Sequence, residues 1–462
     1  MKRTFVAYLL LTLTASITMA QESNKYLKEQ LPEYWSGNGI FSSGDETEGM
    51  WWRRFEDAVL DSLIEVATRR NLSVLTALEN INTAKALWRQ TQATLFPTLD
   101  LNSGWQRGMT SANNPQNAYT RSTEGYFSIS ADFSWEIDIF SRIQKRSKAQ
   151  KQLFMASEEE YRSVMTSLYA NVATTYYSLK QSIAQLKVLQ QNAESQKNIK
   201  SLVESRYNSG LASKLDVAQA RSVYYSTVAS IPSMESTIES LRNALAILLA
   251  TYPSQMSGWH TDGNLPQHVD AVAVGVPAML LRNRPDVRSA EREVEAYALQ
   301  LGAAKRDWLP SFYINGSIGS AAEEIDKIAR ARSITWQIAP SISWNLFDGK
   351  QSTYAKREAQ AALDKSIISF NSTVLKAIQE VENAMSQYRN SIKQIVALSE
   401  AVNHSNETLK LSLDLYKQGL TQFQNVLDAQ RTLLNYQNYL VQAQGGSIVA
   451  LIQLYEALGC GW

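Results

Sequence analysis

The stretch that decides the fold occurs twice: ESRYNSGLASKLDVAQARSVYYS, which begins at Glu204, and LSLDLYKQGLTQFQNVLDAQRTLLNYQNYL, residues 411–440. Each copy contains a single glycine, Gly210 or Gly419, between segments that are otherwise typical of helices. A glycine just past the end of a helix commonly adopts the left-handed conformation that terminates it. We therefore predict that the chain reverses at both glycines, and that each marks the tip of a helical hairpin.

The helices that lead into these turns are predicted to be very long. Neither proline nor glycine occurs between Ser141 and Asn208, or between Lys350 and Gln418. At about 1.5 Å per residue, each helix would be on the order of 100 Å long. Apolar residues recur in steps of four and three, which makes a narrow seam and favours side-by-side packing as coiled coils. A return helix is expected from Ser213 to Ala250.

The same plan runs through both halves of the chain, which indicates an internal duplication. A helical segment ends in a hydrophobic residue and a proline, at TLFPTLDL (94–101) and DWLPSFYI (307–314), and two strand-like segments and the long helix follow. We divide the chain accordingly. The predicted parts are an N-terminal belt segment (21–56), a first structural repeat (57–251), an inter-repeat linker in the same belt (252–277), a second repeat (278–458) and a tail (459–462).

The strand-like segments alternate sharply between apolar and polar residues. In residues 127–139, Phe, Ile, Ala and Trp alternate with Ser, Asp and Glu, and residues 334–346 follow the same rule. Such period-two patterning predicts strands with one apolar and one polar face. Pro340 indicates a bulge or a sheet edge. Weaker strands are expected near residues 99–107 and 311–320, so the chain offers two hairpins.

Two interpretations of these four strands remain open from patterning alone. They suit a transmembrane β-barrel with a wet lumen, and they equally suit a soluble antiparallel sheet packed on a core. A single-chain barrel needs at least about eight strands, so four cannot close one. Unclosed edges are not tolerated in lipid. If these strands span a membrane, several chains must share one barrel.

The first twenty residues predict a secretory signal peptide, with Lys2 and Arg3 before an apolar run and a small-residue exit at Ala20. Gln21 follows the expected cut, so we do not expect N-terminal lipid attachment. The chain has 45 Lys and Arg against 44 Asp and Glu, which gives no indication of nucleic acid binding. Cys460 is the single cysteine, and His260, His268 and His404 are far apart. A disulfide within the chain is excluded, and neither a metal site nor a cofactor is expected.

These features together resemble the outer membrane factor family, the TolC- and OprM-like exit ducts of tripartite efflux pumps. The resemblance covers nearly the whole mature chain. The segments that carry it are weak one by one but specific in this order and with the duplication. They are WWRRFEDAVLDSLIEVA (51–67), LFPTLDL (95–101), SWEIDIFSR (134–142), YNSGLASKLDVAQAR (207–221), LLRNRPDVRSAE (280–291), WLPSFYINGSIG (308–319), SISWNLFDGK (341–350), YKQGLTQFQNVLDAQRTL (416–433) and the tail LYEALGCGW (454–462).

The resemblance implies a homotrimer in the outer membrane of a Gram-negative bacterium. Each chain would give four strands to a shared barrel and its helices to a periplasmic α-barrel tunnel. A periplasmic adaptor and an inner-membrane transporter, of the RND type, would be its partners, and the strands would contact outer membrane lipid. Its expected role is passive conduction of drugs or other small molecules. A duct for secreted proteins and a coiled-coil scaffold without a pore are the alternatives.

The resemblance also implies a gate at the periplasmic tip. The tyrosine before the glycine corresponds to Tyr416, and the two gate carboxylate positions correspond to Asn425 and Asp428. An arginine of some members corresponds to Thr421, so that latch is absent or different here. In the first repeat, Asp216 and Gln219 occupy the equivalent places. Three copies of Asp428 around a narrow axis would favour cations in the mouth.

The chain shows none of the sequence features of an enzyme. No nucleophile–base pair, phosphate loop or metal-ligand cluster is recognisable in it. We therefore predict a non-enzymatic protein whose partners supply the energy. Two departures from the family pattern stand out. Gln21 replaces the lipidated cysteine of many OprM-like members, and Cys460 stands in the tail where glycine would be ordinary.

Overall fold

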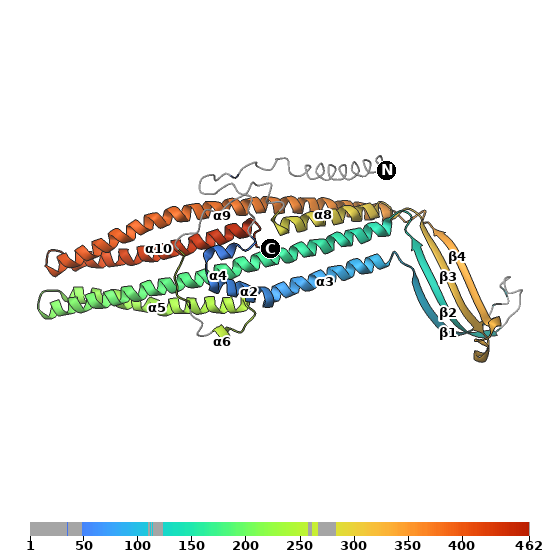
Figure 1. Cartoon of the computed structure of the whole chain (residues 1–462), viewed down its shortest axis with the longest axis horizontal. Helices are drawn as coiled ribbons and strands as arrows, with labels where there is room; N and C mark the ends of the chain where they lie inside the picture. Colours follow the sequence, from blue (N-terminus) through green and yellow to red (C-terminus); the bar gives the residue numbers. More distant parts are fainter. Residues whose placement is uncertain are drawn as a thin grey trace. The chain divides into compact units, whose positions relative to one another are not determined.

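The computed structural model describes Trp35 and residues 49–109, 111, 113, 123–256, 261–266 and 283–461. The predicted signal peptide, most of the N-terminal segment and much of the inter-repeat linker lie outside the described residues. The elements in chain order (Figure 1) are η1 (Trp51–Phe55), α2 (Ala58–Arg70), α3 (Leu72–Ala93), β1 (Thr98–Met109), β2 (Thr123–Ile137), α4 (Arg142–Asn208), α5 (Lys214–Leu248), α6 (Pro253–Met256), α8 (Pro285–Ala304), β3 (Ser311–Ala322), η3 (Ile325–Lys327), η4 (Ala331–Ser333), β4 (Ile334–Ser343), α9 (Gln351–Lys417) and α10 (Phe423–Ala457).

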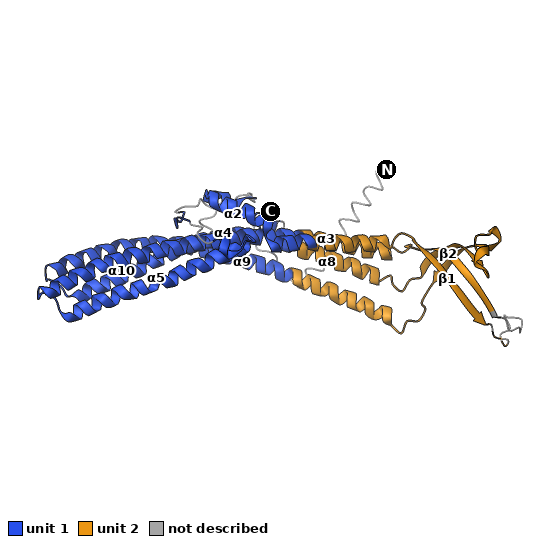
Figure 2. Ribbon diagram, turned by 90° about the horizontal axis from the view of Figure 1, so that it is seen from below, with its two compact units in different colours: residues 1–79, 159–288, 371–462 blue, residues 80–158, 289–370 orange. Residues whose placement is uncertain are grey.

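The chain forms two compact units (Figure 2). Unit 1 comprises residues 1–79, 159–288 and 371–462, and unit 2 comprises residues 80–158 and 289–370. Each unit therefore contains matching segments of both sequence repeats. Unit 1 has the glycine turns and the return helices of both halves, and unit 2 has all four strands.

Unit 2 contains one antiparallel sheet with the strand order β1-β2-β3-β4. Both predicted hairpins are present, and pairing of β2 with β3 joins them. The strands differ from the predicted ranges by a few residues at their ends. β2 starts four residues earlier than predicted and ends two residues earlier, β4 ends three residues earlier, and β1 and β3 each extend two residues further towards the hairpin loops. Pro340 lies in β4, which pairs only with β3, so the predicted sheet edge is confirmed. An edge strand tolerates proline because one row of its backbone groups is unpaired.

The register gives the sheet one apolar and one polar face. Leu101, Ala131, Ile318 and Trp336 are aligned across the four strands, and Leu99, Phe133, Gly316 and Ile338 form the neighbouring row. Between these two rows, on the opposite face, lie Asp100, Asp132, Ser317 and Gln337. The apolar side chains are exposed to solvent in the single chain: Leu101 is 75% exposed and Trp336 is 74% exposed.

The helices of unit 2 are joined to the sheet at one end of its strands. The indole nitrogen of Trp135 donates to the carbonyl of Leu95 (2.9 Å), and that of Trp344 donates to the carbonyl of Trp308 (3.0 Å). The same kind of bond, from a tryptophan indole to a backbone carbonyl, thus occurs in both halves of the chain. Away from the sheet, α8 and α9 share an apolar core formed by Leu301, Leu363 and Ile367, with Val294, Tyr297, Ala298 and Ala359 packed against it.

Unit 1 is built on two helical hairpins, α4–α5 and α9–α10. The long helices begin and end within a residue of the predicted bounds. At the C-terminal end of each, the left-handed glycine that follows, Gly210 or Gly419, fixes where the helix ends. Ser213 caps α5 and forms a capping box with Asp216. Among the described residues, no helix combines the length and the apolar content needed to cross a membrane.

The segment before α2 is anchored on unit 1 by aromatic packing and by a buried charge. Trp51 is fully buried and stacks on Tyr455 of α10, with ring centroids 5.1 Å apart. Asp57, the N-cap of α2, accepts from Tyr176 (2.9 Å) and from Lys180 (3.0 Å), both on α4. These contacts fix the start of the first repeat against the long helix.

Candidate functional site

The two glycine turns have the same backbone geometry. Gly210 has a φ of 76° and Gly419 a φ of 78°, both in the left-handed region. At the first turn, the N–H of Leu211 donates to the carbonyl of Arg206 (2.8 Å) and that of Gly210 donates to Tyr207 (2.9 Å). Residues 415–420 repeat this pair of bonds, which is the Schellman ending of a helix.

An apolar cluster packs the tips of the two hairpins together. Its buried members are Ile199, Val203, Val217, Ala220, Val223, Tyr416, Phe423, Val426 and Leu427, from α4, α5, α9 and α10. Tyr416 is only 5% exposed, and its ring centroid lies 5.2 Å from that of Phe423. The tyrosine that the resemblance assigned to the gate therefore packs within the tip, because its ring fills the space between the two hairpins.

Arg206 makes a short hydrogen bond between the two tips. Its Nη1 donates to the carbonyl of Lys417, the last residue of α9, at 2.6 Å. Its guanidinium carbon lies 5.0 Å from the centroid of the Tyr416 ring, within the range of a cation–π interaction. Burial raises the pKa of the Tyr416 phenol and the charge of Asp216 adds to this rise, whereas Arg206 lowers it. The first repeat thus supplies a cation to the end of the second repeat's long helix.

Polar side chains of α10 continue outward from the turn. The Nδ2 of Asn425 donates to the hydroxyl of Thr421 (2.6 Å), and the Nε2 of Gln424 donates to Asp428 (3.0 Å). Asn425 and Asp428 are both exposed. Gln219 of α5 reaches Gln424 at 3.5 Å, the limit of a hydrogen bond. The gate candidates on α10 therefore lie on one exposed helix face.

The equivalent positions in the two repeats have different chemistry. Asp216 accepts from the backbone N–H of Ser213 (3.2 Å), so its carboxylate is engaged in capping α5. In the second repeat the N-cap is Gln422, which makes no side-chain capping bond, and Asn425 stands where Asp216 does. Because Asp216 is partly buried and caps α5, and Asn425 is neutral, Asp428 is the gate candidate with an exposed charge.

Arg206 was not among the residues selected from the sequence, and neither was Gln424. A comparison of the two repeats could have identified Arg206. The second repeat has Leu415 at the matching position, so the two repeats have a charged and an apolar residue one position before the tyrosine that they share. Gln424 carries no such signal, because its role depends on how close α5 and α10 come.

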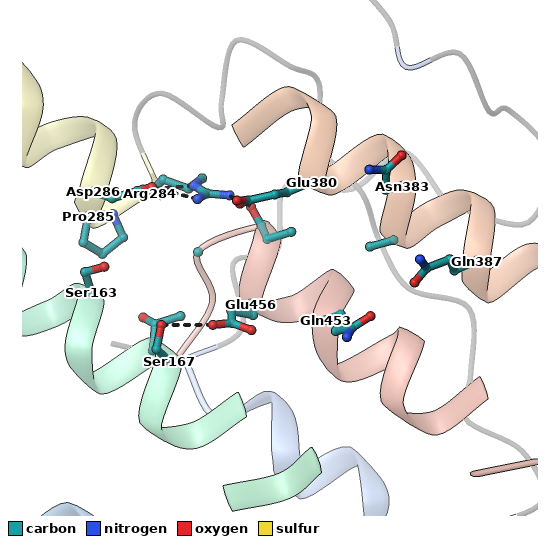
Figure 3. A pocket seen from close by; sticks show the side chains of 14 residues that line it. Ser163, Ser167, Arg284, Pro285, Asp286, Glu380, Asn383, Gln387, Gln453 and Glu456 are labelled. Carbon is teal, nitrogen blue, oxygen red and sulfur yellow. Dashed lines mark hydrogen bonds and ion pairs between the residues drawn. The ribbon is translucent and has the colours of Figure 1, made fainter. Parts of the chain in front are cut away.

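A second polar site in unit 1 surrounds Arg284, in a pocket of about 420 Å³ (Figure 3). The Nε and Nη2 of Arg284 bind Asp286 (3.0 and 2.7 Å), and its Nη1 binds Glu380 (2.7 Å) and the carbonyl of Ala457 (3.0 Å). These bonds join the start of α8 to α9 and to the C-terminal end of α10. Arg284 and Asp286 of the LLRNRPDVRSAE motif therefore have a structural role.

Glu456 lies across the same pocket and accepts a hydrogen bond from Ser167 (3.0 Å) (Figure 3). Burial raises the pKa of this carboxyl and the charge of Glu380 adds to the rise, while Ser167 and Arg284 oppose it. No group of His, Cys, Asp and Glu side chains in the described ranges could hold a metal ion. The pocket therefore contains a half-buried carboxyl that is held towards its neutral form.

Comparison with known proteins identifies the family. A model of the outer membrane efflux protein family matches residues 63–251 and 276–460. The chain belongs to this family. It is 31% identical over 418 residues to the solvent efflux pump outer membrane protein SrpC of Pseudomonas putida. The aligned region covers 88% of this chain and 86% of SrpC. The cation efflux system protein CusC of Escherichia coli K12 is 28% identical over 427 residues, with 92% of each chain covered.

Solved structures of the family have the same fold. The outer-membrane channel OprN superposes with a TM-score of 0.85 at 28% identity, over 94% of this chain and 99% of that chain. A CusC structure superposes with a TM-score of 0.83 at 26% identity, over the same shares. The predicted resemblance is therefore confirmed. Like its relatives, the chain is an efflux channel protein of the Gram-negative outer membrane, in a family of channels that are not enzymes.

Proposed function

We propose that three copies of this chain form the exit duct of a tripartite efflux system of the RND type. The duct would conduct drugs or other small molecules passively from an inner-membrane transporter and a periplasmic adaptor across the outer membrane. The observation that carries this proposal is the sheet of unit 2, with one apolar face, one polar face and two unpaired edges.

The sheet supports a barrel shared between copies. In lipid every backbone polar group needs a partner, but β1 pairs only with β2 and β4 only with β3. The strands alternate in direction, so β4 of one copy can pair antiparallel with β1 of the next. Two copies would give only about eight strands, a barrel that side chains nearly fill. Three copies leave room for a pore lined by the polar face.

The helical hairpins support a tunnel that ends in a gate. Asp428, exposed on α10, would form a ring of three carboxylates around the axis and favour cations in the mouth. Asn425, Thr421 and Gln219 would line the same constriction, while Tyr416 and Arg206 hold the two tips of each chain together. The packing of Trp51 and Asp57 on unit 1 supports the proposal that residues 21–56 belong to a belt around the tunnel.

Exposed apolar residues at the tip also support the proposal that the adaptor docks there. Leu211 and Leu420, which follow the two glycines, are 66% and 69% exposed, and Leu215 is 65% exposed. Exposed leucines at equivalent places in both repeats suit a partner that recognises each tip alike. The names of SrpC and CusC, a solvent efflux pump protein and a cation efflux system protein, support small-molecule efflux.

The experiment uses the full-length protein purified from outer membranes. We expect trimers that resist dissociation in mild detergent and that conduct single-channel currents in planar bilayers. Deletion of the gene should sensitise cells to small toxic molecules, and re-expression should restore resistance. A monomeric, non-conducting protein in the soluble fraction would overturn the proposal.

A further inference from the structure

The helix turns next to the strands of unit 2 are rich in cations. Residues 142–151 contain five basic and no acidic residues, and Lys305 and Arg306 follow α8 directly. The charges on α4 are Arg142, Lys145, Arg146, Lys148 and Lys151. So many positive charges near the end of an apolar sheet face would be stabilised by negative counter-ions.

Arg142 and Lys148 lie on two different faces of α4, and their surroundings differ. Arg142 binds Glu136 and Ser311 (3.3 Å), which both lie on the polar face of the sheet. Lys148 follows Arg142 by six residues, about 240° around the helix at 3.6 residues per turn. Lys148 is exposed, whereas Ile143 and Ser147 between the two faces are buried. Lys148 therefore lies on a different face of α4 from Arg142, away from the contacts that Arg142 makes with the polar face of the sheet.

Lys145 and Arg306 converge around Gly302 of α8. A Cβ on Gly302 would lie 3.2 Å from both Cδ and Nζ of Lys145, so the absence of a side chain there makes room for the lysine. Arg306 donates from Nη1 to the carbonyl of Gly302 (2.5 Å). Burial lowers the pKa of Lys145, and the charges of Arg306 and Lys148 lower it further. Three cations thus gather at the junction of α4 and α8.

Nearby carboxylates are already engaged. Asp307 is bound by two nitrogen–oxygen contacts from Arg146 (2.9 and 3.0 Å), and Asp138 accepts from the backbone N–H of Gln144 (2.7 Å). Within the described residues, neither lysine nor Arg306 forms an ion pair. The cluster is therefore an uncompensated positive site, which an anion from outside the chain would stabilise.

The position of the cluster relative to the apolar sheet face indicates which anion it binds. The apolar sheet face ends at exposed tryptophans, Trp344 (53%) and Trp308 (57%), a residue type that gathers where lipid meets water. Lys145 lies about 5 Å along α4 from its first residue at about 1.5 Å per residue. The headgroup layer is roughly 5–7 Å thick on each side of the hydrocarbon core. The cluster therefore lies at the depth of lipid phosphates.

We propose that Lys145, Lys148 and Arg306 bind the phosphate of an anionic phospholipid in the inner leaflet of the outer membrane. The proposal rests on the strands spanning that membrane, as proposed above. A zwitterionic phospholipid brings its own ammonium group and would leave the three cations partly uncompensated. The preferred lipid is therefore a phosphatidylglycerol or a cardiolipin.

The test compares lipid retention by purified full-length variants in native mass spectrometry. Wild type should retain phosphatidylglycerol in preference to phosphatidylethanolamine. The variant K145Q/K148Q/R306Q should lose this preference, by roughly fivefold in apparent affinity for each cation removed. The control K376Q/K393Q/K410Q removes the same charge from exposed positions of α9 and should retain the lipid as wild type does. If the triple variant does not assemble, Lys148→Gln alone replaces it in the test, because Lys148 is exposed and its substitution should not disturb folding. This single variant should lose roughly fivefold in apparent affinity.

The remaining outcomes separate this proposal from its alternatives. Equal retention by the triple variant and the control would overturn it. Displacement of the lipid by millimolar inorganic phosphate would assign the cluster to free anions and overturn it as well. A change in the ion selectivity of the pore with unchanged lipid retention would place the cations in the lumen. Conductance of the same preparations tests the proposed duct separately. A protein that conducts but shows no lipid preference would overturn the lipid-binding proposal and leave the proposed duct intact.

Discussion

Asp428 is exposed on α10, and among the gate candidates its charge is not used in capping. We expect Asp428→Ala to weaken block of the channel by a multivalent cation such as spermidine. The substitution removes one charge from each of three copies, and a charge at short range in water is worth about 1 kcal/mol, so the block should weaken by about fivefold for each charge that contacts the blocker. Single-channel recording measures this. Glu235→Ala, an exposed carboxylate on α5 away from the turn, is the control, and unchanged block in Asp428→Ala would count against the gate assignment.

Arg206 joins the tips by charge and by hydrogen bonding, so its loss should loosen them. Arg206→Ala removes the bond to the carbonyl of Lys417 and the contact with the Tyr416 ring. Together these are worth about 2 kcal/mol, so the ratio of open to closed channels should rise about thirtyfold. Arg221→Ala is the control, because Arg221 binds Glu204 within the first hairpin (2.8 Å). If both variants conduct alike, Arg206 does not hold the tips together.

Glu456 gives the stability of the protein a predictable dependence on pH. A carboxyl whose pKa is raised in the folded state stabilises the fold at low pH, and this contribution is lost as pH rises above the ordinary value of 4.5 and through the raised one. We expect Glu456→Gln to raise the melting temperature at pH 7 but not at pH 4. The amide oxygen can still accept from Ser167. Thermal unfolding at the two pH values measures this, and a gain that is equal at both would contradict it.

At the scale of the element, the duplication provides a matched pair of helix starts. Ser213 caps α5 with its side chain, whereas Gln422 at the start of α10 makes no such bond. Ser213→Ala should destabilise the first turn of α5 by about 1 kcal/mol. Gln422→Ala should change α10 very little. Amide hydrogen exchange of residues 214–217 and 423–426 measures both effects, and equal changes in the two helices would argue against the capping box.

The elements themselves follow from local sequence, and the contacts between them do not. The two glycines and the absence of proline set the ends of α4 and α9, and strict alternation sets the faces of β2 and β4. The tie between Arg206 and Lys417 depends on how closely α4 and α9 approach. No periodicity within either helix encodes that distance. The placement of Trp51 on Tyr455 was unpredictable for the same reason.

At the scale of the whole molecule, the two faces of β1 should respond oppositely to one substitution. Leu101 is on the apolar face and Asn102, next to it, is on the polar face, where its Nδ2 donates to Asp132 (2.7 Å). An arginine facing lipid costs about 2–4 kcal/mol near the middle of a bilayer, whereas an arginine in a wet lumen does not. Leu101→Arg should therefore reduce the amount of trimer in outer membranes.

Asn102→Arg is the matched variant on the opposite face. It should assemble normally and shift the conductance towards anions, because it adds a positive charge to each copy of the pore lining. The measurements are the yield of trimer in outer membrane fractions and the reversal potential in a salt gradient. Normal assembly of Leu101→Arg would mean that the apolar face contacts neither lipid nor a protein core, because a buried arginine is costly in both. An unchanged reversal potential in Asn102→Arg would mean that the polar face of the sheet does not line a pore. The two neighbouring residues thus distinguish a shared membrane barrel from a soluble sheet, the choice that patterning alone left open.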